Sequence, residues 1–273
     1  MDTVFKIYRF TLFIITLLFL IGGFTMPQIR NQERSKVQAV NIKVVYDNNP
    51  FLKGLQTDWG FSCLVEVGKT RLLFDTGSNG DILLHNMAKL GIDPESIDIV
   101  FLSHSHYDHT GGLSEFLIKN SNVTIYYPQS FQINLIDEMK KRGASLIPVS
   151  VFREIRTNIF SLGELDGAIP EQSLAIRTSK GIVVITGCAH PGIINILETA
   201  KKSFPGEPIF LAMGGFHLHN QTDIKSIINK MNEMSVLKAA PCHCSGDKAR
   251  QLFKDAFEEN YIEIGTGQVI KID

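Results

Sequence analysis

Short runs of apolar and β-branched residues alternate with amphipathic segments from about residue 41 to the end of the chain. The runs predict strands, because such residues pack well on a pleated, half-buried surface. Gly68-Lys69 and Lys180-Gly181 each separate two runs, which is typical of β-hairpin turns. The strands expected on this basis cover residues 41–46, 62–67, 70–74, 97–102, 123–127, 173–178, 182–186, 208–213, 236–240 and 269–272.

Other segments carry apolar residues at helical spacing and predict helices that cover the strands. The first of them ends at Gly91, and a later one follows Thr222, a candidate N-cap residue. The expected helices cover residues 81–90, 193–202, 224–234 and 248–259. Two strand-rich halves with helices outside them predict either a four-layer αββα sandwich or a doubly wound sheet.

The N-terminal segment differs from the rest, because it is uncharged from Phe10 to Met26 and apolar all round. Its length just reaches the ~17 residues that can span a bilayer, and basic residues precede it. We expect a membrane-anchored domain on the extracytoplasmic side, and the alternative is a cleaved signal peptide with a secreted or periplasmic product. The predicted organisation is a signal anchor or transmembrane segment, a polar linker and a single domain, over residues 1–27, 28–40 and 41–273.

Composition narrows the function further. The 27 Lys and Arg residues nearly balance 28 Asp and Glu residues, so no nucleic-acid partner is expected. A hydrophobic share of 44% with 20% charged residues is that of a globular protein and excludes wholesale disorder. Four cysteines are too few for a disulfide scaffold in 273 residues, and Cys242-His243-Cys244 points to metal or thiol chemistry instead.

Most of the eight histidines directly follow predicted strands. Imidazole and carboxylate are ligands that suit Zn, Mn or Fe. His104 and His106 lie two residues apart, so in an extended turn they face one ion, while Asp108 and His109 can turn to a second. The histidines that follow strands are His104, His106, His109, His190, His217 and His243. The sequence therefore predicts a metal site at these strand ends.

Several of these segments resemble the metallo-β-lactamase superfamily over roughly residues 41–273. They are Leu73-Phe74-Asp75-Thr76-Gly77, the pattern His104-x-His106-x-Asp108-His109, and Gly111-Gly112. Further segments resemble a subfamily of metal-dependent hydrolases and of archaeal-type dihydropterin ribofuranosyl-aminobenzene phosphate synthases. The most specific are Thr186-Gly187-Cys188-Ala189-His190-Pro191-Gly192, Gly214-Gly215-Phe216-His217-Leu218 and Pro241-Cys242-His243-Cys244-Ser245-Gly246. The resemblance implies an αββα fold with a dinuclear site between its sheets, held by His104, His106, Asp108, His109 and His243.

The chain departs from the superfamily pattern around its central hairpin. Hydrolases of this fold commonly supply a ligand histidine before the hairpin and a metal-bridging aspartate after it. Here no histidine lies between His109 and His190, and Glu171 is the nearest polar residue to the empty histidine position. Cys188 follows the hairpin where the aspartate is expected. His190 is therefore an expected ligand and Cys188 a possible one, and a thiolate would favour Zn or Fe over harder ions.

Other residues near these segments have two readings. Asp75 could orient a ligand histidine from behind or cap the turn at Gly77. His217 follows two glycines and could act on the substrate, complete the metal ring or merely pack in its loop. Cys242 and Cys244 are expected as small buried neighbours rather than ligands.

Two divalent ions, Zn first with Fe or Mn as alternatives, would supply a metal-bound hydroxide and clamp an electrophilic oxygen. The sequence therefore predicts a metal-dependent hydrolase of a small-molecule ester, lactone, thioester or phosphoester, in which Asp108 holds an ion and could shuttle a proton. A synthase-like transferase is the alternative enzyme, which an exported domain disfavours because such metabolites are cytoplasmic. A membrane-tethered metal-binding protein without catalysis is the third hypothesis.

Overall fold

A computed structural model of the chain describes residues 38–218 and 223–273, which belong to one unit, Lys36–Asp273. The predicted membrane segment and almost all of the predicted linker lie outside the described residues, as does Thr222. Within the described ranges, no helix is both long and apolar enough to cross a bilayer.

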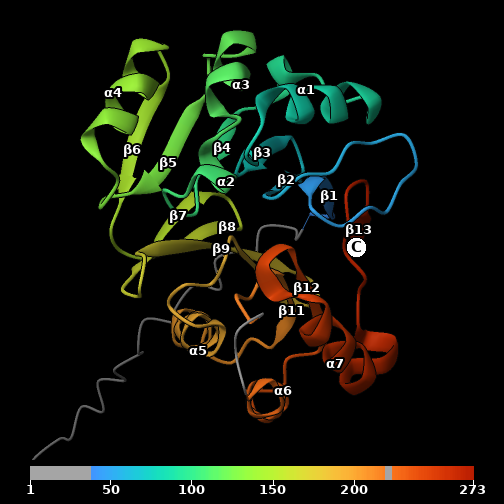
Figure 1. Cartoon of the computed structure of the whole chain (residues 1–273). Coiled ribbons are helices and arrows are strands. Elements are labelled where there is room, and N and C mark those ends of the chain that lie inside the picture. Colours follow the sequence, from blue (N-terminus) through green and yellow to red (C-terminus); the bar gives the residue numbers. More distant parts are fainter. Residues whose placement is uncertain (1–37, 219–222) are drawn as a thin grey trace, which may run out of the picture. The chain divides into compact units, whose positions relative to one another are not determined.

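The first of two sheets has seven strands in the order β13-β1-β2-β3-β4-β5-β6 (Figure 1). From β13 to β3 neighbouring strands are antiparallel, and from β3 to β6 they are parallel. The strands are β1 (Val40–Asp47), β2 (Phe61–Val67), β3 (Thr70–Phe74), β4 (Ile99–Phe101), β5 (Thr124–Pro128), β6 (Ser145–Val149) and β13 (Val269–Ile272).

The second sheet has six strands in the order β12-β11-β10-β9-β8-β7. Strands β10, β11 and β12 run parallel, and β7 to β10 form an antiparallel meander. The strands are β7 (Arg153–Arg156), β8 (Ile159–Leu165), β9 (Glu171–Thr178), β10 (Gly181–Thr186), β11 (Ile209–Gly215) and β12 (Lys238–Cys242).

Helices cover the outer face of each sheet, so the domain has four layers (Figure 1). The helices on the first sheet are α1 (Gly80–Lys89), α3 (Leu113–Lys119) and α4 (Ile133–Lys141), and α2 (Tyr107–Thr110) is a short helix that follows β4 at the end of the strand (Figure 1). Those on the second are α5 (Ile193–Ser203), α6 (Ile224–Glu233) and α7 (Asp247–Phe257). Single turns of 3-10 helix occupy Pro94–Ser96, His243–Ser245 and Glu258–Asn260. Of the two predicted architectures, the structure has the αββα sandwich.

The alternation of buried side chains explains how the layers form. Leu72 and Phe74 of β3 join the core between the sheets, whereas Leu73 faces the helices. Successive side chains of a strand point to opposite faces, so a strand that is apolar throughout lies between two layers. Strands predicted at 70–74 and 269–272 have the same bounds in β3 and β13.

Some boundaries differ from the prediction for local physical reasons. Asp223, rather than Thr222, caps α6 in the structure, because its carboxylate accepts a hydrogen bond from the Ser226 N–H. Strand β7 was not predicted, since Ile155 is its only buried residue and leaves no alternating pattern. The other α-helices and strands that were not predicted are α2, α3, α4, β6 and β8, and the 3-10 turns at Pro94–Ser96 and His243–Ser245 were not predicted either.

Candidate metal centre

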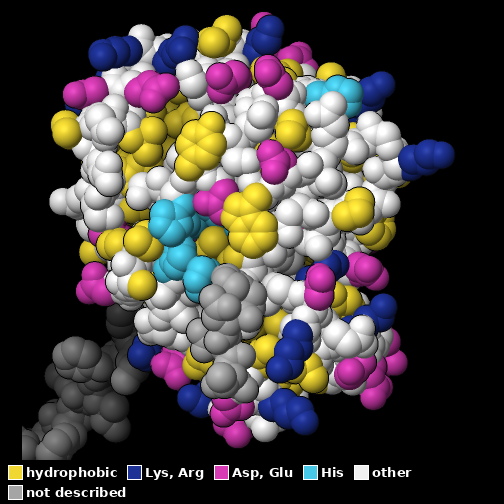
Figure 2. Space-filling view, viewed as in Figure 1, with side chains coloured by type: hydrophobic (Ala, Val, Ile, Leu, Met, Phe, Trp, Pro, Cys, Tyr) yellow, Lys and Arg dark blue, Asp and Glu magenta, His cyan; other side chains and the backbone are white. Residues whose placement is uncertain are grey.

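The side chains singled out in the sequence converge at the carboxyl ends of β4, β10, β11 and β12. His104 and His106 follow β4, and Asp108 and His109 lie in α2. Parallel strands bring their carboxyl ends to the same edge of a sheet, so loops that are distant in sequence meet there. The loop residues that follow the other strands are Cys188, His190, His217 and His243. Figure 2 shows histidine side chains gathered in one patch, with acidic and apolar side chains beside them.

Left-handed backbone at the strand ends aims these loops into the site. Asp75, Ala189, His217 and His243 have φ angles of 52°, 59°, 50° and 49°. Such conformations cost non-glycine residues about 1–3 kcal/mol each and persist where the surrounding structure enforces them. Their concentration after β3, β10, β11 and β12 indicates that the fold is under local strain where its functional side chains meet.

The first group of candidate ligands consists of three imidazoles. The ligand atoms of His104, His106 and His190 all lie within 4.8 Å of one another. The ring centroids of His104 and His106 are 4.8 Å from each other and 4.8 and 4.9 Å, respectively, from that of His190. His190 therefore completes a group of three imidazoles, although no histidine lies between His109 and His190 in the sequence.

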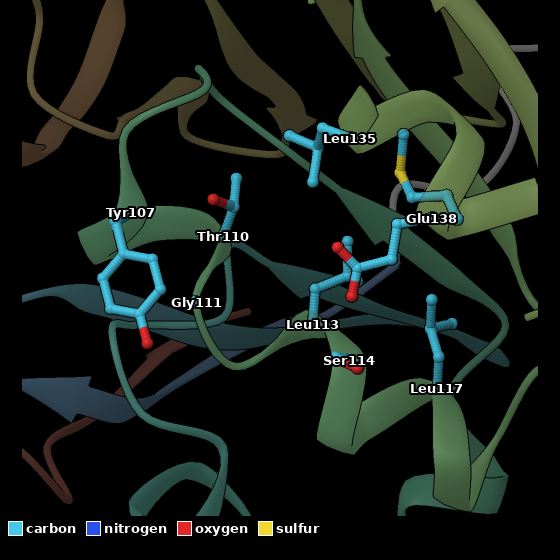
Figure 3. Close-up of a pocket in the computed structure, with 9 residues that line it drawn as sticks. Tyr107, Thr110, Gly111, Leu113, Ser114, Leu117, Leu135 and Glu138 are labelled. Atoms are coloured by element: carbon cyan, nitrogen blue, oxygen red, sulfur yellow. The ribbon is translucent and has the colours of Figure 1, made fainter. Parts of the chain in front are cut away.

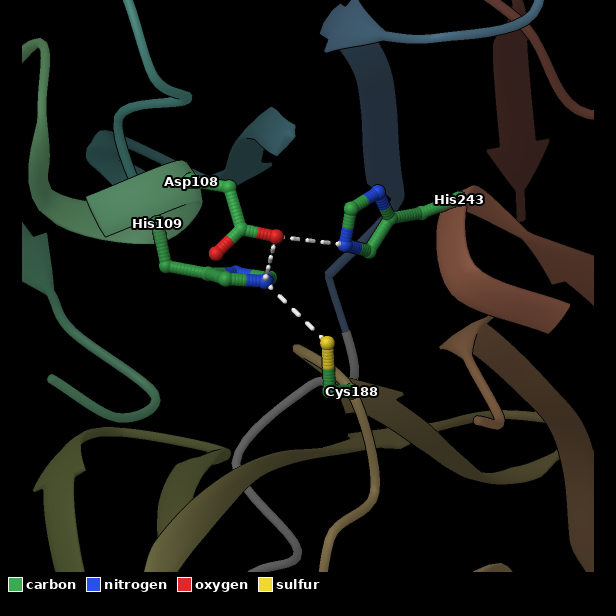
Figure 4. Close-up of side chains that lie close together, drawn as sticks. All are labelled: Asp108, His109, Cys188 and His243. Atoms are coloured by element: carbon green, nitrogen blue, oxygen red, sulfur yellow. Dashed lines mark hydrogen bonds and ion pairs between the residues drawn. The ribbon is translucent and has the colours of Figure 1, made fainter. Parts of the chain in front are cut away.

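The second group combines a carboxylate, two imidazoles and a thiol (Figure 4). Asp108 Oδ2 is 3.5 Å from His109 Nε2 and 3.2 Å from His243 Nε2. Cys188 Sγ is 3.3 Å from His109 Nε2, and in Figure 4 all four side chains point toward a common centre. Cys188 thus lies among the second set of donors, where the superfamily pattern places an aspartate.

Asp75 orients two of the imidazoles from behind. Its Oδ2 is 2.7 Å from His109 Nδ1 and accepts a hydrogen bond from Ser103 Oγ at 2.7 Å. Because the Ser103 hydroxyl donates to Asp75, its oxygen can accept from His104 Nδ1, 2.9 Å away. When the rings are neutral, as an ion requires, both carry their proton on Nδ1 and present the lone pair of Nε2 to the site.

Asn48 orients His243 in the same way. Its Oδ1 is 3.0 Å from His243 Nδ1 and, as an amide oxygen, can only accept, so that nitrogen carries the proton. Sequence reasoning missed Asn48 and Ser103. Asn48 lies 195 residues before His243 in the chain, and no local pattern connects the two.

The residues fit a divalent ion by the chemistry of their donors. Among the described residues, Nε2 of His104 and Nε2 of His190 are buried and have no hydrogen-bond partner. A buried polar atom without a partner is costly, and an ion that accepts both lone pairs removes that cost. Imidazole, carboxylate and thiolate together suit Zn or Fe.

Glu171 holds the loop that presents Cys188 and His190. Its Oε1 accepts hydrogen bonds from the N–H groups of Gly187, Cys188 and Ala189 at 3.0 Å, and its Oε2 accepts from that of His190 at 2.9 Å. Burial raises the pKa of this carboxyl despite the four donors. Glu171 belongs to neither ligand group, so it shapes the site and does not replace the missing histidine.

His217 and Cys244 lie beside both groups. The ligand atoms of His217, Cys188 and His190 lie within 4.8 Å of one another, and the His217 ring centroid is 4.7 Å from that of His190. A hydrogen bond to the Cys244 sulfur raises the pKa of His217. Cys242 packs in the core between the sheets, as expected for a small buried neighbour, whereas Cys244 is buried but contacts the site.

The charged groups of the centre shift one another's pKa. Burial lowers the pKa of His109, but the carboxylates of Asp75 and Asp108 outweigh it and raise it to about 9. Burial acts to raise the pKa of Asp108, yet His243 and His109 hold it well below its usual range. Burial, together with His217 and His106, lowers the pKa of His190 to about 4. Asp108 and His109 of the second group are therefore both charged near neutral pH, whereas His190 of the first group is neutral.

The comparisons place this site in a known class of protein. Residues 60–245 match the family model of the metallo-beta-lactamase superfamily. The chain therefore belongs to the metallo-β-lactamase superfamily. It is 30% identical to the 7,8-dihydropterin-6-methyl-4-(beta-D-ribofuranosyl)-aminobenzene-5'-phosphate synthase of Methanocaldococcus jannaschii, in an alignment that covers 82% of this chain and 92% of the relative.

Solved structures show the same fold. The crystal structure of Tm1679, described as a metal-dependent hydrolase of the beta-lactamase superfamily, superposes with a TM-score of 0.72 at 31% identity and covers 86% of this chain and 99% of its own. The metallo-beta-lactamase fold protein YhfI from Bacillus subtilis has a TM-score of 0.64 at 16% identity, with 86% and 99% covered. The similarity to YhfI extends to the fold alone.

Proposed function

We propose that this protein is a metal-dependent hydrolase that holds two divalent ions, Zn first with Fe or Mn as alternatives, and cleaves a small-molecule ester, lactone, thioester or phosphoester. The observation that carries the proposal is the pair of adjacent ligand groups. The ring centroids of His104 in the first group and His109 in the second are only 4.2 Å apart. This spacing supports two ions side by side, with His104, His106 and His190 on one and Asp108, His109, His243 and Cys188 on the other.

Divalent ions in these groups would supply Lewis acidity and lower the pKa of water toward neutrality. The chain's own residues do the rest. Asp75, Ser103 and Asn48 fix the imidazole tautomers, so no reorganisation is needed when a substrate arrives. His217 is half-buried and its hydrogen bond with Cys244 favours the imidazolium, so it can donate a proton to a leaving-group oxygen. Asp108 would hold an ion through its carboxylate, which its low pKa keeps ionised.

A paired-variant experiment tests the proposal. His104→Ala should lose bound metal and turnover together, because a buried ligand of a preassembled ring is removed. His85→Ala, a change of a histidine on α1 outside the ligand groups, should keep both. Metal content and hydrolysis of ester, lactone, thioester and phosphodiester substrates are measured on each variant. Full turnover in His104→Ala would contradict the proposal, and bound metal without turnover on any substrate would favour a non-catalytic metal-binding protein.

A synthase-like transferase is the second candidate. Its support is the relative from Methanocaldococcus jannaschii, which is named as a synthase and aligns with 82% of this chain. Incubation with a ribofuranosyl-aminobenzene phosphate and a dihydropterin whose 6-methyl carbon carries a diphosphate leaving group separates the two candidates. A joined product with release of diphosphate points to the transferase, whereas cleaved products of the hydrolase panel without any joined product point to the hydrolase.

The location of the protein is part of the proposal. The uncharged stretch Phe10–Met26 supports a membrane-anchored chain with its domain on the extracytoplasmic side. Protease added to intact cells should then degrade the domain, and protection of the domain until lysis would contradict this orientation.

A further inference from the structure

A cavity of about 270 Å³ opens directly beside the candidate metal centre. His190 and His217 line it, and the start of α5, the segment after β11 and α6 supply the other walls. The wall side chains used below are Ile194, Phe216, Leu218 and Ile227. They come from segments that also build the core beneath the second sheet.

The described lining of the cavity is apolar except for two side chains. His190 and His217 are the only polar side chains among the described residues that line it. His190 belongs to the three-imidazole group, so the cavity adjoins the candidate ion site. A pocket with mostly apolar walls and a few polar groups orients a ligand that is itself mostly apolar and has a polar part.

A second cavity lacks this arrangement. It has a volume of about 150 Å³ and lies between α2, α3 and α4, with Leu113, Leu135 and Glu138 among its lining residues (Figure 3). No side chain of either ligand group lines it. Of these two cavities, the one beside His190 joins an apolar volume to candidate ligands.

The volume sets the size of the group that the cavity admits. A dry apolar cavity of about 150 Å³ accepts benzene, which corresponds to about 25 Å³ per carbon atom. At that density, a cavity of about 270 Å³ holds about ten carbon atoms. We propose that this cavity binds the apolar part of the substrate. The substrate then carries an alkyl or aryl group of up to about ten carbons next to the bond that reacts at His190 and His217.

The apolar subsite defines a substrate class for the proposed hydrolase, and the reaction at this subsite rests on that proposed function. Binding of an apolar group in the cavity can be measured without turnover. Each methylene that enters the cavity should strengthen binding about fourfold, since burial of one methylene favours the bound state by about 0.8 kcal/mol. The gain should end at about ten carbons, where the cavity is full.

Binding of alkanohydroxamates to the full-length Zn-loaded protein tests the inference, because the hydroxamate group binds the metal and only the chain length changes. We expect affinity to rise about fourfold per methylene from acetohydroxamate to about decanohydroxamate, and then to level off. A flat series would overturn the inference. Benzohydroxamate and naphthohydroxamate form the aryl arm, and an affinity above that of alkyl chains of equal carbon number would identify the group as aryl.

Variants of the walls provide the controls. Ile227→Trp on α6 should fill the cavity and make the series level off at a shorter chain, and Ile194→Ala on α5 should extend it. Asn229→Trp adds the same side chain to the exposed side of α6 and should leave the series unchanged. If Ile227→Trp and Ile194→Ala both keep their metal and the wild-type series, the cavity is not the binding site.

The outcome also separates this inference from the proposed function. A rising series that Ile227→Trp shortens, in a protein that hydrolyses none of the substrate panel, would keep the subsite and refute the hydrolase. Hydrolysis that accompanies a flat series would keep the hydrolase and refute the subsite.

Discussion

Replacing Asp75 by asparagine should weaken Zn binding although Asp75 lies in neither ligand group. Its Oδ1 accepts the Ser103 N–H, and its Oδ2 accepts the Ser103 hydroxyl and the His109 Nδ1–H. In Asp75→Asn, an NH₂ group replaces one of these oxygens. If it takes the place of Oδ2, it faces two donors, so His109 is forced to accept at Nδ1 and to carry its proton on Nε2. That tautomer has no lone pair for an ion.

The size of the effect follows from the hydrogen bond that is lost. The contact between His109 Nδ1 and Asp75 Oδ2 measures 2.7 Å and is fully buried. A hydrogen bond to a charged group contributes about 1.5–3 kcal/mol, which corresponds to roughly 10- to 100-fold in affinity. Loss of a residue that orients a metal ligand typically has an effect of about the same size. We therefore expect Zn affinity to fall by roughly 10- to 100-fold.

Chelator competition measures this affinity, and thermal unfolding checks that each variant is folded. Asp81→Asn is the matched control, because it removes the same charge from an exposed position in the first turn of α1. Ser103→Ala should lose less than Asp75→Asn, since it leaves the contact between Asp75 and His109 in place. A folded Asp75→Asn variant with the Zn affinity of the wild type would refute the argument.

Three further predictions follow from the same geometry. The raised pKa of His109, about 9 against 6.5, means that its imidazolium stabilises the metal-free fold below pH 6.5 and that this contribution is lost as the pH rises through 9. Zn binding should therefore release a proton from His109 below pH 9. The affinity for Zn, measured by chelator competition, should then fall at least about tenfold for each pH unit below 9, and a pH-independent affinity would contradict this. Cys188→Asp should keep both ions and shift the metal preference from Zn toward Mn, because a carboxylate replaces a thiolate. Competition between the two metals measures this preference, and an unchanged preference would show that the thiolate is not a ligand. Deletion of residues 1–30 should leave a soluble, metal-loaded domain, because the core and both ligand groups lie beyond residue 38, and an insoluble or metal-free product would argue against a separate domain.

The sequence was most informative where a local pattern determines the structure. The hairpin at Gly68-Lys69 and the helix that ends before Gly91 follow from alternation and from glycine, and both are present. The histidine-rich segment 104–109 was identified from spacing alone, and the structure brings its ligand atoms into two groups. The least predictable strand, β7, has a single buried residue and thus no periodicity.

Contacts between distant segments could not be predicted in this way. From the sequence, His190 was an expected ligand and Cys188 a possible one. In the structure Cys188 joins Asp108, His109 and His243, His190 joins His104 and His106, and the ligand atoms of Cys188 and His190 also lie within 4.8 Å of each other and of His217. Their placement depends on Glu171, whose carboxylate gathers four successive N–H groups from a loop that begins 16 residues later. Likewise, the pairing of Asn48 with His243 depends on two sheets meeting, which no single segment specifies.

X-ray absorption at the Zn edge of the loaded protein, together with its Zn content, tests the central claim most directly. The proposed centre predicts two Zn ions per chain and a ligand shell that contains sulfur at about 2.3 Å in addition to nitrogen and oxygen at about 2.0–2.2 Å. The sulfur contribution should disappear in Cys188→Ser. A single ion, or a wild-type shell of nitrogen and oxygen alone, would contradict the two ligand groups as assigned.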